Sequence, residues 1–248
     1  MGAVYMSSMT NMIARLLSHL MTRVKTPADE AEARAIQDEL RKRVVLDEPG
    51  PEPGRGLVAG VDVAYDDERD LVAAAAVVLD AATLGVVAES TAVGHVSFPY
   101  VPGLLAFREL PTVLAALEAL PVTPGLVVCD GYGLAHPRGF GLACHLGVVT
   151  GLPSIGVAKN PFTFTHEEPG APRGAASPLL AADGSVVGRA LRTRHGVKPV
   201  FVSVGHRVSL DRACAHTLAL SPRFRIPETT RHADSLCRRA LREAGEGR

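Results

Sequence analysis

The stretch from residue 127 to residue 148 joins an apolar run to a helical pattern through a glycine-rich turn, VVCDGYGLAHPRGFGLACHLGV. The run from Gly125 to Cys129 predicts a buried strand that ends at Asp130, and apolar residues recur with helical spacing from Phe140. This succession is typical of α/β sheets, which place their chemistry at the ends of strands. Asp130 is either a group of such a site or the N-cap of the helix, and the stretch alone leaves both interpretations open.

Apolar runs elsewhere in the chain predict the rest of one sheet. Three strands at 57–65, 71–79 and 84–96 are separated by two short turns, a pattern that predicts an antiparallel meander. Thr26 and Pro27 indicate a helix start with Thr26 as the N-cap. The remaining predicted elements are helices at 26–44, 104–120, 140–150, 210–220 and 231–244, strands at 153–157 and 200–204, and a hairpin around Asp183 and Gly184. Together they predict a mixed sheet with helices on both faces.

Length and charge limit the classes of protein that fit. A chain of 248 residues suits one domain over residues 26–248, and residues 1–25 are expected to be a disordered N-terminal extension. The net charge of zero argues against an overall basic nucleic-acid binder, although six arginines between 223 and 242 leave a local basic surface open. The four cysteines form no CxxC spacing, and no apolar run is long enough for a membrane span. A cytoplasmic monomer is expected.

Three acidic residues stand where acids are unusual or chemically useful. Asp62 is a lone acid in an otherwise apolar strand, which is costly unless the group is functional or faces water at the strand edge. Glu109 follows Arg108 on a helix, where a surface salt bridge is the ordinary interpretation. If Asp62, Glu109 and Asp130 converge, they form an oxygen-rich site for Mg²⁺, which supports hydrolysis of phosphodiesters.

Two further residues could assist such a site. His136 could move a proton, and Lys159, which follows a short strand, could neutralise a phosphate or orient water. The structural alternatives are a polar surface histidine and a solvated lysine at a strand end.

The segment FPYVP, residues 98–102, predicts a stiff loop because its two prolines fix φ and remove hydrogen-bond donors. Without further information, the preferred interpretation is a rigid surface loop that caps the helix that follows.

Six segments in order resemble the endonuclease V family, the deoxyinosine 3′ endonucleases. They are AGVDVAY (59–65), FPYVPGLLAFRELP (98–111), VVCDGYGLAHPRGFGLACHLGVV (127–149), PSIGVAK (153–159), GHRVSLDRA (205–213) and RIPETTRHAD (225–234). The resemblance covers about residues 27 to 243 and implies a ribonuclease-H-like α/β fold, a mixed sheet whose first three strands are antiparallel. It also implies cleavage, dependent on Mg²⁺ or Mn²⁺, of the second phosphodiester 3′ to hypoxanthine in DNA, leaving a 3′-hydroxyl and a 5′-phosphate.

The resemblance assigns roles by motif position. The metal carboxylates are Asp62, Glu109 and Asp130, the active-site histidine near a second metal is His136, and the catalytic lysine is Lys159. The wedge residues are Pro99, Tyr100, Val101 and Pro102. Candidates for the base pocket are Gly131, Leu134 and Gly156. Candidates for DNA contacts are Arg138, His206 and Arg207.

Four positions depart from the family pattern: Tyr132, Gly139, Asn160 with Pro161, and Thr229. None is an expected metal ligand, so they bear on DNA affinity and on the pocket rather than on the reaction. An endoribonuclease for inosine-containing RNA is the alternative within the same class. A binding protein without cleavage is disfavoured because all three carboxylates are present.

Overall fold

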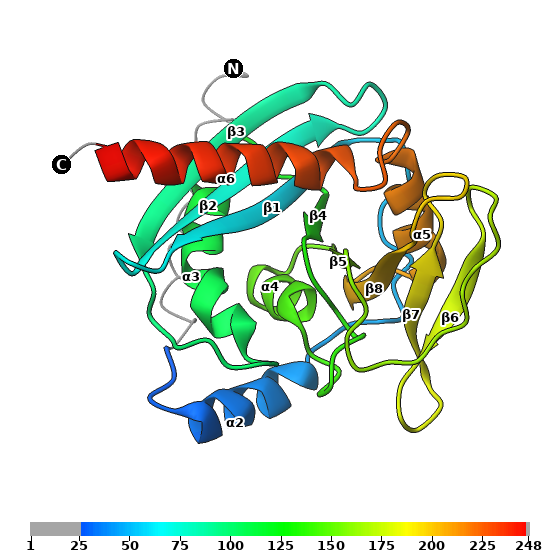
Figure 1. The fold of residues 1–248 in the computed structure, drawn as a ribbon, viewed down its shortest axis with the longest axis horizontal. Helices are drawn as coiled ribbons and strands as arrows, with labels where there is room; N and C mark the ends of the chain where they lie inside the picture. The colour runs from blue at the N-terminus through cyan, green and yellow to red at the C-terminus, as the bar shows by residue number, and fades with distance from the viewer. Residues whose placement is uncertain (1–25, 247–248) are drawn as a thin grey trace, which may run out of the picture.

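The computed structural model describes residues 26–246, so the extension expected at residues 1–25 lies outside the described residues. One eight-stranded sheet runs through them in the order β3-β2-β1-β4-β5-β8-β7-β6 (Figure 1). The strands are β1 (Leu57–Asp66), β2 (Leu71–Asp80), β3 (Val86–His95), β4 (Leu126–Cys129), β5 (Ser154–Ala158), β6 (Ala176–Leu180), β7 (Val186–Leu191) and β8 (Val200–His206). The helices are α2 (Glu30–Arg41), α3 (Leu105–Glu118), α4 (Leu142–Thr150), α5 (Leu210–Ala219) and α6 (Glu228–Glu246).

Strand direction decides which ends of the strands meet. β1, β2 and β3 form the predicted antiparallel meander, and the predicted hairpin is formed by β6 and β7. β1, β4 and β5 are parallel neighbours, with Val61 opposite Cys129 and Cys129 opposite Gly156. Their carboxyl ends therefore share one edge of the sheet. β8 is antiparallel to β5, so its last residue, His206, lies beside Ser154 at the other edge.

Alternating side chains build a core on each face of the sheet. In β2, Ala74, Ala76 and Val78 pack under α3, whereas Ala75, Val77 and Leu79 pack under α6. α4 joins α3 on the first face, and α5 joins α6 on the second. Figure 1 shows α6 crossing β1, β2 and β3. This is the mixed sheet covered on both faces that the sequence predicted.

One predicted helix start is wrong, and one of the two interpretations left open for Asp130 is excluded. α2 begins at Glu30, and its N-cap is Asp29, whose Oδ1 accepts a hydrogen bond from the Glu32 N–H at 2.8 Å. Asp29 therefore satisfies one of the unpaired N–H groups at the start of α2, and Thr26 lies before the helix. α4 has Gly141 as its N-cap, so Asp130 does not cap this helix. No helix within residues 26–246 is long and apolar enough to cross a membrane.

Candidate active site

Asp62 and Asp130 stand side by side at the shared carboxyl edge. Each follows one member of the Val61–Cys129 pair, and both members face the α3 layer. Because side chains alternate, the two aspartates turn toward the α6 face. Asp62 accepts a hydrogen bond from the Val63 N–H at 2.8 Å. Burial, followed by repulsion from Asp130, raises the pKa of Asp62 to about 7.

Glu109 reaches the same place from α3. Its side chain is buried, and Oε1 accepts a hydrogen bond from the Tyr65 hydroxyl at 3.1 Å. Burial is the main cause that raises the pKa of Glu109 to about 8, and repulsion from Asp62 and Asp130 adds to it. Arg108 instead forms an ion pair with Asp67 at 3.0 Å. The surface salt bridge expected for Glu109 is therefore not formed.

Lys159 follows β5 and forms an ion pair with Asp130. Partial burial of its ammonium group acts to lower its pKa, but the hydrogen bond with Asp130 and the charges of Asp130 and Asp62 outweigh this, so the pKa is raised. The lysine stays charged beside the carboxylates.

Asp234 is a fourth acid near this edge that the sequence did not single out. It lies on α6, and its charge acts on both Asp62 and Lys159. In the sequence it stands among arginines on a polar helix, where an acid has the pattern of a solvated face, and it does pair with Arg238 at 2.9 Å. Its place as the last residue of the segment 225–234 was the only available signal.

The donor set at this edge suits a hard divalent cation. Asp62, Glu109 and Asp130 supply only carboxylate oxygens, which Mg²⁺ prefers, and the positive charges that act on them are Lys159 for Asp62 and Asp130 and Arg108 for Glu109. Within residues 26–246, no three His, Cys, Asp or Glu side chains are already arranged to hold a metal ion. Asp130 would therefore exchange Lys159 for a cation. The excess of buried negative charge makes that exchange favourable.

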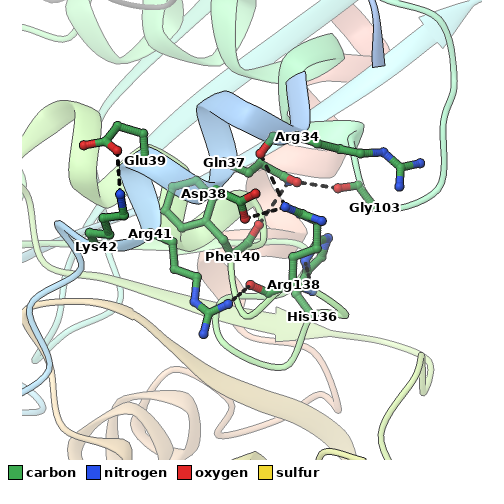
Figure 2. A network of polar contacts seen from close by, with 10 residues as sticks. All are labelled: Arg34, Gln37, Asp38, Glu39, Arg41, Lys42, Gly103, His136, Arg138 and Phe140. Atoms are coloured by element: carbon green, nitrogen blue, oxygen red, sulfur yellow. Dashed lines mark hydrogen bonds and ion pairs between the residues drawn. The ribbon is translucent and has the colours of Figure 1, made fainter. Parts of the chain in front are cut away.

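His136 belongs to a network with α2 that Figure 2 shows. Its Nδ1 accepts a hydrogen bond from the Arg138 N–H at 3.2 Å, and its ring lies against Gly103. Burial lowers the pKa of His136 to about 4, although a hydrogen bond to the Gly103 backbone acts in the opposite direction. The ring is neutral at neutral pH and ties two loops together.

Arg138 and Gln37 complete this network (Figure 2). Arg138 forms an ion pair with Asp38 and donates to the Arg34 carbonyl at 3.4 Å. Gln37 is buried, and its Nε2 donates to the Gly103 carbonyl at 2.9 Å and to the Phe140 carbonyl at 3.4 Å. α2 thus braces the loop before α3 and the loop before α4. The guanidinium of Arg138 is already engaged by this brace.

The predicted wedge protrudes from a buried anchor. Phe98 is buried, and its ring centroid lies 5.8 Å from that of Phe107. Tyr100 is 69% exposed, and both Pro99 and Pro102 are exposed, while Val101 is partly buried. The loop leads directly into α3, and Glu109 lies about one helical turn after the start of that helix at Leu105. The tip is rigid and aromatic, and only a short stretch of sequence separates it from Glu109.

The three residues predicted for the base pocket have different surroundings. Gly131, at φ +151°, and Leu134 are partly buried in the loop after β4. Gly156 is buried, and a Cβ there would lie 2.6 Å from the Gly131 carbonyl oxygen and 2.7 Å from the Gly133 nitrogen. The backbone of the loop therefore fills the space beside Gly156. The absence of a side chain at Gly156 lets the loop pack on β5.

His206 and Arg207 lie at the opposite edge of the sheet from the carboxylates. His206 is buried, and its Nδ1 accepts a hydrogen bond from the Val45 N–H at 3.2 Å. Arg207 forms an ion pair with Glu48 at 2.9 Å. Because β8 is antiparallel to β5, the end of β8 points away from Lys159. These positions do not support the predicted phosphate contacts near the cut.

A ribonuclease-H-like α/β sheet with acids at one edge defines a class of nucleases that hydrolyse phosphodiesters. The family model for Endonuclease V matches residues 38–235. Endonuclease V of Streptomyces avermitilis is 80% identical over 218 residues, which are 88% of this chain and 95% of that protein. Its crystal structure aligns with a TM-score of 0.87, covering 88% of this chain and 96% of that chain. The protein belongs to the endonuclease V family and is an endonuclease.

Two more relatives extend the comparison. Endonuclease V of Nocardia farcinica is 62% identical over 224 residues, which cover 90% of this chain and 98% of that protein. Endonuclease V of Ciona intestinalis was solved in complex with a 24mer DNA containing an inosine followed by a ribo-adenosine. It aligns at 28% identity with a TM-score of 0.75, covering 86% of this chain and 98% of that chain.

Proposed function

We propose that this endonuclease acts in DNA repair and nicks DNA beside deaminated bases. It cleaves the second phosphodiester 3′ to hypoxanthine and leaves a 3′-hydroxyl and a 5′-phosphate. The observation that carries the proposal is the acidic edge formed by Asp62, Glu109 and Asp130 beside Lys159. The Ciona relative, which was solved with inosine-containing DNA, supports the choice of lesion.

Asp62, Glu109 and Asp130 would hold the metal ion, Mg²⁺ or Mn²⁺. When bound, the ion supplies an acidified water and stabilises negative charge on the leaving oxygen. Lys159, displaced from Asp130, is then free to contact the phosphate, and its raised pKa keeps the ammonium charged. Asp234 adds negative charge on the α6 side of the same edge.

The loops on the α3 side would recognise the lesion. A base must leave the stack before its edge can be read, at a cost of a few kcal/mol. Tyr100 fills the gap in the duplex, and the two prolines and buried Phe98 limit the entropy lost on binding. Gly131 and Leu134 offer backbone groups to the displaced base. His136, neutral and bonded to both loops, holds the wedge relative to this pocket.

Tyr132, one of the departures from the family pattern, connects two loops near the proposed site. Tyr132 stacks on Phe162 with ring centroids 5.6 Å apart, and its hydroxyl donates to the Asn160 carbonyl. The aromatic pair therefore joins the loop after Asp130 to the loop after Lys159. It stiffens both loops beside the pair of Asp130 and Lys159.

RNA is a second candidate substrate. The DNA in the Ciona structure carries a ribo-adenosine after the inosine, so that relative accepts a 2′-hydroxyl at this position. We propose that inosine-containing RNA competes with DNA for the same site.

A cleavage assay with Mg²⁺ on matched oligonucleotides tests the proposal. The substrates are deoxyinosine DNA, inosine RNA and unmodified controls, with EDTA as the blank. We expect a single nick one nucleotide beyond the deoxyinosine that disappears with EDTA. Preferred cleavage of the RNA would keep the site and change the substrate, and no cleavage of any oligonucleotide by folded protein would overturn the proposal.

We further propose that the protein works as a monomer in the cytoplasm. All four cysteines, Cys129, Cys144, Cys214 and Cys237, are free and buried, as suits a reducing compartment. Size-exclusion chromatography with light scattering tests the oligomeric state.

A further inference from the structure

A groove on the α6 face adjoins the acidic edge and shares two residues with it. Lys159 and Asp234 line it together with Phe224, Arg225, Thr230 and Arg231, and its volume is about 310 Å³. The wedge and the base-pocket loop lie on the other side of the sheet, against α2, α3 and α4. A strand that crosses the carboxylates from the wedge side would leave through this α6 groove.

An aromatic ring and an arginine form one wall of the α6 groove. Phe224 is 42% exposed, and the Arg231 guanidinium lies 3.4 Å from the centroid of its ring. Arg231 also forms an ion pair with Glu228 at 2.8 Å, which fixes it over the ring. Exposed aromatic rings with an arginine beside them are the usual platform on which nucleic-acid bases stack.

One polar group of the α6 groove has only neutral partners, and another has no partner. Arg225 donates to the carbonyls of Lys159, Lys198 and Pro199, and within residues 26–246 it has no carboxylate partner. The Thr230 hydroxyl is buried and has no hydrogen-bond partner in the same part of the chain. A buried hydroxyl without a partner is costly, so a ligand oxygen would stabilise it.

The position of Thr230 favours an anionic ligand. It lies in the first turn of α6, which begins at Glu228 and runs for 19 residues. The first N–H groups of a helix have no partners within the helix, and the dipole there attracts negative charge. A free hydroxyl, an uncompensated guanidinium and a helix start therefore meet beside Lys159, which matches a phosphate group.

We propose that the α6 groove binds the first nucleotide on the 3′ side of the cleaved bond. Its base stacks on the face of Phe224 opposite Arg231, and the phosphate on its 3′ side lies near Thr230 and Arg225. The inference rests on the proposed function, because it takes the cut to occur over Asp62 and Asp130. It assigns the groove to the strand that carries the new 5′-phosphate, and it gives the α6 face a share in substrate binding.

Two deoxyinosine DNA substrates test the groove. Both contain the cleaved bond and continue on its 3′ side, and they differ only at the first nucleotide there, which carries a base in one substrate and is abasic in the other. For the wild type we expect KM to be lower for the substrate with the base by about tenfold, the size of one stacking contact. Phe224 and Arg231 are both exposed in the structure, and in the double variant Phe224→Ala, Arg231→Gln we expect the ratio of the two KM values to fall to about one. The control is Arg239→Gln, which removes another α6 arginine, paired with Glu89, and should keep the wild-type ratio.

A binding measurement separates this inference from the proposed function. Fluorescence anisotropy in EDTA compares a short DNA strand that has a native phosphate after its first nucleotide with the same strand that has a neutral methylphosphonate at that position. The wild type is expected to prefer the phosphate, and Thr230→Val, which keeps the shape of the buried side chain, loses the preference. An equal affinity of the wild type for both strands, or a variant with the wild-type KM ratio, overturns the groove. Failure of the proposed function shows differently, as absence of any cut at deoxyinosine.

Discussion

Both edges of the central sheet carry ionisable side chains, but these side chains have different surroundings at the two edges. At the carboxyl edge of β1, β4 and β5, Asp62 and Asp130 share a partly buried place, where Lys159 is paired with Asp130. At the other edge of β5, His206 and Arg207 have their partners within the fold, in Val45 and Glu48. Negative charge is therefore in excess at the carboxyl edge, whereas the polar groups at the other edge have partners within the protein.

The two edges differ because one forms the candidate active site and the other makes structural contacts. Burial is the main cause that lowers the pKa of His206, so this edge holds a neutral ring that anchors the segment before β1. At the carboxyl edge, burial instead crowds groups of one sign, which is the arrangement that functional sites use. Strand direction, and not residue type, decides which of the two a polar residue joins.

Removal of a carboxylate is the largest expected effect. Asp130→Ala should lower cleavage of deoxyinosine DNA by at least about a thousandfold, or ~4 kcal/mol, because a ligand of the cation and the partner of Lys159 are lost together. Binding of uncut substrate in EDTA should remain close to wild type. Asp211→Asn, which removes an exposed acid paired with Arg189, is the matched control. Normal cleavage by Asp130→Ala would show that Asp130 is not part of the active site.

Exchange of one cation at each edge tests the comparison itself. Lys159→Gln should reduce the cleavage rate by about a hundredfold, as is typical for a group that acts on the reacting phosphate. Arg207→Gln, at the opposite edge, should leave the rate nearly unchanged and lower only the melting temperature slightly, because its pair with Glu48 is solvent-exposed. Equal losses in the two variants would show that the edges do not differ as described.

Removal of the wedge tip should have a moderate effect that depends on the substrate. Tyr100→Ala is expected to reduce cleavage of duplex deoxyinosine DNA by about tenfold, because an exposed aromatic side chain that fills the gap in the stack is lost. Cleavage of a single-stranded substrate, which has no stack to open, should change much less. Val186→Ala, an exposed residue on β7, is the control. An unchanged preference for inosine in duplexes would count against the wedge.

A stability measurement probes the crowding of the acids without any substrate. The pKa of Glu109 rises from 4.5 to about 8 on folding, so the folded chain binds this proton more tightly than the unfolded chain does. The stabilisation is complete below pH 4.5 and is lost as the pH rises through 8. In EDTA, Glu109→Gln should therefore gain about 1 kcal/mol or more over wild type between pH 5 and pH 8.

Urea unfolding at the two pH values gives this difference, and the exposed Glu243→Gln on α6 provides the control. Addition of Mg²⁺ at pH 8 should stabilise the wild type more than Glu109→Gln. A stability difference that does not change with pH would mean that Glu109 is not crowded as the structure indicates.

Local patterns in the sequence determined most of the fold. Alternating and continuous apolar runs gave β1, β2, β3 and β4, and the Asp-Gly turn gave the hairpin of β6 and β7, because these signals depend on neighbours in the chain. The lone acid Asp62 and the strand-end acid Asp130 stood out for the same reason: burial of an acid among apolar residues is costly wherever the strand lies. Helix starts were less certain, since Asp29 and Thr26 both fit the local pattern of a cap.

Tertiary structure alone decided which polar residues meet. Asp234 reaches the acidic edge because α6 packs across β1, and His206 leaves it because β8 runs antiparallel to β5. Gly156 faces the backbone of a loop and not a base, which depends on how residues 131–133 pack on β5. Strand direction and helix packing are set by contacts between distant segments, so the sequence named the acids of the site, and only the fold showed which groups surround them.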